Sequence, residues 1–184
     1  MAAKKKTLTS QRKPRIGVYL SCEASVGEQY QRSLSIVEAL EDYTDKYAIY
    51  VYSPYKIWKQ YCRKRPLDYR PFPTSGASNF LGRFMFRKYL TAPDPPEWLG
   101  EMLARKAVDE KLIVLIFPTA SSMAQQISIP VITAADLDTA LSPDKGLSPV
   151  ALSKELMTMI KAATYKQPPL SDSPHNDSNN SDDE

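Results

Sequence analysis

The stretch that decides the fold is RIGVYLSCEASVGEQYQRSLSIVEALEDY, residues 15–43. Its first part, IGVYL at 16–20, is a short apolar run with β-branched residues, which is typical of a strand buried on both faces. A loop with a single glycine, Gly27, follows. The next residues predict a helix, because apolar side chains recur at the spacings of three and four that one buried face requires: Tyr30, Leu34, Val37 and Leu40.

Three further apolar runs, at 47–53, 112–117 and 129–133, predict more strands. The first of them completes a βαβ unit with the opening stretch, and such units build parallel sheets with right-handed crossovers. We therefore predict an α/β fold. It consists of a single Rossmann-like domain with a mainly parallel sheet flanked by helices, over residues 15–165.

Helical patterns separate these strands. Residues 55–65 are amphipathic, 118–127 predict one or two helical turns, and a final helix is expected from Ser148 and Pro149 onward. Another helix is expected to begin at Asp94, which would act as its N-cap. Residues 66–96 are rich in proline and predict irregular structure, apart from a helix-like pattern at 79–90.

Charge is concentrated at the two ends of the chain. Residues 1–15 carry six lysines and arginines without an acid, and residues 171–184 carry five acids without a lysine or arginine. Subtracting +6 and −5 from the total of +3 leaves only +2 for the body, which argues against a nucleic-acid partner. We interpret residues 1–14 as a basic disordered head and 166–184 as an acidic disordered tail.

The same composition bears on location and chemistry. The head has no apolar core of signal-peptide length, and no run is long enough to span a membrane, so we expect a cytoplasmic protein. The basic head allows weak peripheral contact with the inner face of a membrane. Two cysteines are too few for a disulfide framework, and no Cys/His spacing suggests zinc. The only histidine, His175, lies in the acidic tail, so no catalytic Ser/His or Cys/His pair is available within the domain.

Candidate binding residues follow the expected strands, because ligands of doubly wound folds sit at the carboxyl ends of parallel strands. The first loop contains Ser25, Gly27 and Tyr30, but it lacks GxGxxG and the P-loop pattern. We therefore interpret it as a tight strand-to-helix joint beside a crevice, and we predict no nucleotide cofactor. A second group, Thr119, Ser121 and Ser122, follows the strand at 112–117. Thr119 is expected either to cap the next short helix or to contact a polar ligand.

A third candidate is Asp136, which lies two residues before Asp138 after the strand at 129–133. Two carboxylates at this spacing are hard oxygen ligands that can hold Mn²⁺ or Mg²⁺. A helix-cap or turn role for either aspartate is the alternative that we favour, so no metal site is predicted.

Three quoted segments together resemble the amino-terminal half of GT-B glycosyltransferases of the family-4-like type. They are the opening stretch, YAIYVYSPYKIWKQY (47–61) and LIVLIFPTASSMAQQISIPVITAADLD (112–138). The resemblance implies an amino-terminal Rossmann-like domain that holds the sugar acceptor. In such enzymes a second domain grips the nucleotide sugar, and that donor-binding half has no counterpart in this sequence.

The functional expectation is therefore an acceptor-side half-domain that does not catalyse transfer alone. Reaction at a cleft between two domains needs both walls for positioning and electrostatic stabilisation. A separate donor-binding subunit or another protein would complete it, with a sugar acceptor as its ligand. The alternative is a non-enzymatic α/β interaction or regulatory module derived from a glycosyltransferase.

Overall fold

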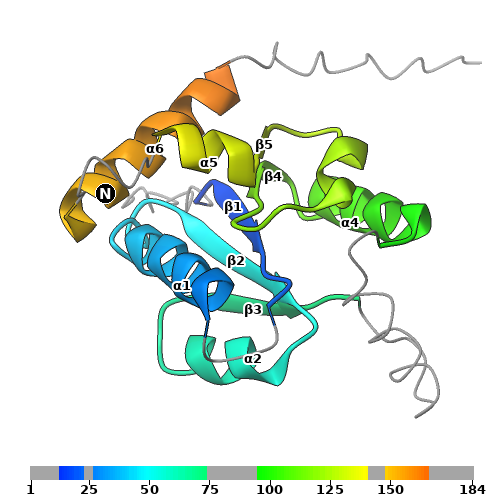
Figure 1. Ribbon diagram of the computed structural model, residues 1–184, viewed down its shortest axis with the longest axis horizontal. Coiled ribbons are helices and arrows are strands. Elements are labelled where there is room, and N and C mark those ends of the chain that lie inside the picture. The colour runs from blue at the N-terminus through cyan, green and yellow to red at the C-terminus, as the bar shows by residue number, and fades with distance from the viewer. Residues whose placement is uncertain (1–12, 23–26, 74–94, 141–147, 166–184) are drawn as a thin grey trace, which may run out of the picture.

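The structure is a computed structural model that describes residues 13–22, 27–73, 95–140 and 148–165 (Figure 1). Its sheet has five strands in the order β3-β2-β1-β4-β5, and every neighbouring pair is parallel. This confirms the predicted α/β class and a Rossmann-like arrangement. The strands are β1 (Arg15–Tyr19), β2 (Ala48–Ser53), β3 (Asp68–Pro71), β4 (Leu112–Ile116) and β5 (Val131–Ile132).

Helices cover both faces of this sheet. They are α1 (Glu28–Glu41), α2 (Lys56–Cys62), α4 (Glu97–Asp109), α5 (Ala134–Ala140) and α6 (Pro149–Tyr165), with a 3₁₀ helix, η1 (Ser122–Gln126). Buried side chains of α1, α2, α5 and α6 share one core cluster with the sheet, and those of α4 and η1 share a second. None of the helices described has the length and apolar character that crossing a membrane requires.

Side chains alternate between the two faces of the sheet along each strand, and the two core clusters therefore differ in composition. Ile16 and Val18 of β1 point into the first cluster, which is mainly aliphatic around the sheet. Tyr19 points into the second, where Tyr50 and Tyr52 of β2 join it. Tyr19 also contacts Phe72 and Phe117, with ring centroids 5.9 and 5.6 Å apart. The sheet is therefore buried on both sides, as the apolar run at 16–20 predicted.

Gly17 lies at the point where β1 is most closely packed. A Cβ atom placed on Gly17 would lie 2.6 Å from Cδ1 of Leu112 and 2.8 Å from Cδ1 of Leu115. It would also lie 3.2 Å from the ring of Tyr52. This ring extends across β1 so that the Tyr52 hydroxyl donates a 2.6 Å hydrogen bond to Oε2 of Glu110. The absence of a side chain at Gly17 is what leaves room for this contact.

Several expectations about element boundaries were wrong or fall outside the described residues. Residues 66–96 do not lack regular structure, because β3 forms there as a four-residue edge strand that pairs only with β2. Its short length and flanking prolines hid it. The strand expected at 129–133 is shorter, β5 covering only Val131–Ile132, and α4 has Pro96 rather than Asp94 at its N-cap position. The helix expected at 79–90, the head at 1–12 and the tail at 166–184 lie outside the described residues.

We expect Gly17→Val to destabilise the fold, because its methyl groups must displace Leu112, Leu115 and Tyr52. Overpacking of this kind costs about 1–3 kcal/mol of unfolding free energy. Chemical denaturation measures the loss, with Ala162→Val, at an exposed position of α6, as the control. An unfolding free energy unchanged by Gly17→Val would contradict the packing described here.

Alkaline pH should also destabilise the protein. Burial raises the pKa of the Cys62 thiol to about 12, and burial likewise raises the pKa of the Tyr19 and Tyr52 hydroxyls. In the unfolded chain the pKa of a cysteine thiol is about 8.5 and that of a tyrosine hydroxyl is about 10. The unfolded state thus loses these protons at lower pH than the folded state. The unfolding free energy should be intact below about pH 8 and fall as the pH rises above about 9. Denaturation at about pH 7 and pH 10.5 tests this, and a constant value would contradict it.

Candidate functional site

The carboxyl ends of β1 and β4 lie side by side, at the point where the chain turns toward opposite faces of the sheet. These strands are neighbours in the sheet, yet the chain leaves them in opposite directions. After β1 it enters α1 on the first face, and after β4 it enters η1, whose Met123 packs in the second cluster. Divergence of this kind opens a crevice at the carboxyl edge of a parallel sheet, which is where ligands of doubly wound folds bind.

Two hydroxyl groups meet at this edge. Oγ of Ser21, which follows β1, lies 2.9 Å from Oγ1 of Thr119, which follows β4, and either group can donate. Thr119 is 9% exposed and Ser21 is half-buried. Because 98 residues separate them in the sequence, this contact links the two strand ends directly. We call this contact the Ser21–Thr119 hydroxyl pair.

The described part of the first loop is held firmly on the first face. The buried hydroxyl of Ser53 donates to the carbonyl oxygen of Leu20 over 2.8 Å. Nε1 of the fully buried Trp58 donates to the carbonyl oxygen of Cys22 over 3.3 Å. The side chains of Leu20 and Cys22 both enter the first core cluster. Ser21 lies between these two anchors, which fix its position beside Thr119.

Gly27, just before α1, has a backbone conformation that other residues rarely adopt. It occupies the N-cap position of α1 with φ of 125° and ψ of 163°, a region that is essentially restricted to glycine. Its carbonyl oxygen accepts the first helical hydrogen bond, from the N–H of Gln31. A Cβ atom at Gly27 would meet nothing within 4 Å, so steric crowding does not explain this glycine. Its backbone angles are what require glycine at the start of α1.

Asp136 completes a capping box at the start of α5. Its Oδ2 accepts 2.7 Å hydrogen bonds from both the backbone N–H and the hydroxyl of Thr133. The N–H of Asp136 in turn donates to Oγ1 of Thr133 over 3.3 Å. These reciprocal bonds satisfy polar groups that a helix start leaves open. The helix-cap interpretation of Asp136 therefore has direct structural support.

Asp138 takes part in a different contact, between α5 and α1. Its Oδ1 lies 2.6 Å from NH1 of Arg32, whose NH2 donates to the carbonyl oxygen of Ala134 over 2.8 Å. The two aspartates therefore face different protein partners. Across the described ranges of the chain, no group of three or more His, Cys, Asp and Glu side chains is placed to hold a metal ion.

The other sequence-derived candidates are spread around this edge. The ring of Tyr30 packs beside Trp58, with centroids 5.2 Å apart, and the two serines Ser121 and Ser122 are half-buried at the start of η1. Ser25 lies outside the described residues. The expected capping role of Thr119 is wrong, because Ser121 is the N-cap residue of η1 and Thr119 contacts Ser21 instead.

Sequence reasoning missed Ser21 and Arg32. Ser21 follows the strand at the position that strand alternation directs away from Leu20 and Cys22, so its placement could have been found from that pattern. Arg32 gave no such signal, because its partners Ala134 and Asp138 are more than 100 residues away. Its guanidinium connects α1 to α5 through Asp138 and the carbonyl oxygen of Ala134.

Comparisons of the chain with protein-family models, with curated proteins and with solved structures found no match. The resemblance to glycosyltransferases therefore stays a prediction from the sequence.

The two aspartates of α5 should respond differently to mutation. Asp136→Ala should lower the unfolding free energy by about 1 kcal/mol, because it removes the capping box. Asp138→Ala should change it by less than about 0.5 kcal/mol, since its ion pair with Arg32 is largely exposed. Thermal and chemical denaturation distinguish the two. If both variants instead lost Mn²⁺ affinity without a difference in stability, the metal-binding interpretation would replace this one.

Proposed function

We propose that this chain is a glycosyltransferase-like, acceptor-side half-domain that binds a sugar acceptor at the carboxyl edge of β1 and β4. The Ser21–Thr119 hydroxyl pair carries the proposal. The single hydrogen bond between the two groups uses one O–H and one lone pair. One O–H and three lone pairs remain, and this mixture of donor and acceptors suits the hydroxyls of a saccharide.

The position of the pair supports this function. Both residues lie at the point where the chain diverges to opposite faces, so a ligand there would contact two different loops. Anchoring by Ser53 and Trp58 holds Ser21 in place before a ligand arrives, which reduces the ordering cost of binding. The resemblance of residues 15–138 to an acceptor-holding domain agrees with this placement.

We propose further that the chain does not transfer sugar alone. A transfer reaction needs a positioned acid or base and groups that stabilise developing charge. Near this edge, the carboxylate of Asp136 accepts the capping hydrogen bonds of α5, and Asp138 is paired with Arg32. A donor-binding partner would supply the second wall of the cleft. The alternative, a non-enzymatic interaction module, predicts no saccharide binding at this edge.

Saccharide binding can be tested by ligand-observed NMR on the full chain with a panel of monosaccharides and disaccharides at millimolar concentration. We expect binding to the native chain, and a loss of about tenfold or more in affinity in the double variant Ser21→Ala/Thr119→Val. Two lost hydrogen bonds of about 0.5–1.5 kcal/mol each account for this change.

Thr158→Val is the matched control, because this hydroxyl lies at an exposed position of α6 and donates to the carbonyl oxygen of Lys154 in its own helix. Melting curves confirm that each variant is folded. No saccharide binding by the native chain, or equal binding by the double variant, would refute the site. Efficient glycosyl transfer by the purified chain alone would refute the half-domain proposal while leaving the acceptor site intact.

A further inference from the structure

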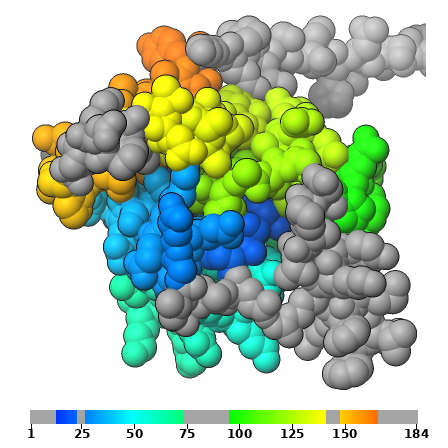
Figure 2. Space-filling view, in the orientation of Figure 1, coloured from blue at the N-terminus to red at the C-terminus, as the bar shows by residue number. Residues whose placement is uncertain are grey.

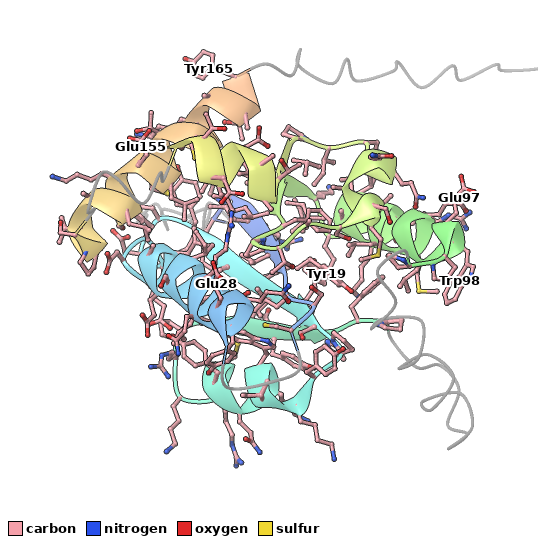
Figure 3. The ribbon with its side chains drawn as sticks, in the orientation of Figure 1. Tyr19, Glu28, Glu97, Trp98, Glu155 and Tyr165 are labelled. Carbon is pink, nitrogen blue, oxygen red and sulfur yellow. The ribbon has the colours of Figure 1, made fainter. Side chains whose placement is uncertain are left out.

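The outer side of α2 and the turn after it carry the densest positive charge in the described residues. Residues 56–65 contain five of the 24 lysines and arginines of the chain and no acid. Four of these five are exposed and form no ion pair with the residues that the structure describes, and we call them the α2 basic surface: Lys56, Lys59, Arg63 and Lys64. Nitrogen-tipped side chains project from α2 away from the rest of the protein (Figure 3).

The position of this surface is fixed by packing on the opposite side of α2. Trp58 and Cys62 of α2 are buried in the first core cluster, as is Tyr55 just before it. Because residues three and four apart share one side of a helix, the cations at 56, 59 and 63 form a stripe on the other side. In the space-filling view, α2 lies at the lower edge of the molecule (Figure 2). The cations therefore face solvent as a group.

Two acidic residues near this surface, Glu41 and Asp68, form ion pairs with other arginines, whereas Glu38 forms none among the described residues. Glu41 of α1 pairs with the fifth cation, Arg65, over 2.9 Å, and Arg65 also stacks on the ring of Tyr61. Asp68 pairs with Arg70 over 2.7 Å. Glu38 is exposed on α1 and its charge acts on Tyr61, at the margin of the surface. Within the described ranges, no ion pair within 4.0 Å joins an acid to any of the four surface cations.

This arrangement places like charges beside one another on α2. Like charges three and four residues apart on a helix repel one another, and Lys56, Lys59 and Arg63 have these spacings. The fold offers no compensating carboxylate for them in the described residues. An anionic partner outside the domain would remove the repulsion, so the charge pattern is better explained by binding than by stability.

We propose that the α2 basic surface docks on a lipid bilayer rich in anionic phospholipids. Four exposed cations on a short helix and the turn that follows it are a typical contact with such a bilayer, where each cation near the surface contributes to attraction. The charge of the bilayer is spread over many headgroups, so it complements a row of flexible side chains without a shaped pocket. This inference does not depend on the saccharide site.

Other anionic partners fit this surface less well. Tight protein interfaces are centred on buried aromatic or arginine anchors, and the only tryptophan of α2, Trp58, is fully buried in the core. Single-stranded nucleic acids need exposed aromatic rings for base stacking, whereas Tyr61 is half-buried beneath Arg65. The body of the chain is also close to neutral, unlike domains that follow a nucleic-acid backbone.

The contact should be electrostatic and should not involve insertion. The apolar residues of α2 are part of the core and cannot enter a bilayer without unfolding this part of the protein. Binding should therefore depend on the fraction of anionic lipid and fall steeply as salt shortens the range of attraction. It should be insensitive to membrane curvature, which inserting amphipathic helices detect.

Sedimentation with vesicles tests the proposal on the full chain. The probes are vesicles of phosphatidylcholine alone and vesicles with phosphatidylserine added, at about 50 mM salt. We expect binding only to the anionic vesicles. The variant Lys56→Gln/Lys59→Gln/Lys64→Gln should reduce partitioning by about a hundredfold, as expected for three surface lysines. Lysine-to-arginine substitutions at the same three positions should retain binding, because they keep the charge.

The matched control is Lys46→Gln/Lys154→Gln/Lys161→Gln, which removes the same charge from other exposed positions. All variants keep the native residues 1–15, so the head contributes equally to each. Equal loss in both triple-glutamine variants would assign binding to net charge and overturn the proposal. So would equal binding of the native chain to neutral vesicles, or no binding to anionic ones. Selective loss of binding to double-stranded DNA, with vesicle binding intact, would assign the surface to nucleic acid.

Discussion

The structure depends on β1 being buried on both of its faces. This strand pairs with β2 on one side and β4 on the other, so every other element is positioned relative to it. Its aliphatic residues support the helices of the first face, while Gly17 leaves the second face open to the ring of Tyr52. The order of the strands and the separation into an aliphatic and an aromatic core both follow from this central position.

The same strand also positions the saccharide site that we propose. The chain turns to one face after β1 and to the other after β4, so the two strand ends are adjacent while their continuations separate. Hydroxyl groups at this edge then meet across a distance of 98 residues in the sequence. On the opposite side of the first core, α2 exposes cations because its apolar residues are needed inside. Packing against the buried strand β1 thus orients both the proposed saccharide site and the α2 basic surface.

The sequence predicted the fold better than it predicted the site. Strand 16–20 was recognisable because burial on both faces gives a continuous apolar run, and the helix after it because one buried face gives apolar spacings of three and four. The strand β3 was missed because four residues, the last of them a proline, are too few to show a period. Contacts such as Ser21 with Thr119, or Arg32 with Asp138, depend on how distant segments pack, and no local pattern records that.

Gly27 illustrates how one residue can be read in two ways. A glycine after a first strand commonly signals a phosphate-binding turn, yet here its backbone angles alone require glycine. Asp136 is a similar case, since a carboxylate spacing that suits metals instead serves a helix start. The backbone angles of Gly27 and the side-chain hydrogen bonds of Asp136 each give a structural role that the residue type alone did not assign.

The burial of both native thiols has a practical consequence. Cys22 and Cys62 are free but lie inside the first core, and Cys22 contacts the hydroxyl of Ser33 within it. Alkylating reagents act on exposed thiolates, which these residues do not present in the folded protein. A cysteine introduced on the surface would therefore be the single reactive position. Fluorophores or spin labels could be attached there to report on ligand and vesicle encounters, with both original sulfur atoms left in place.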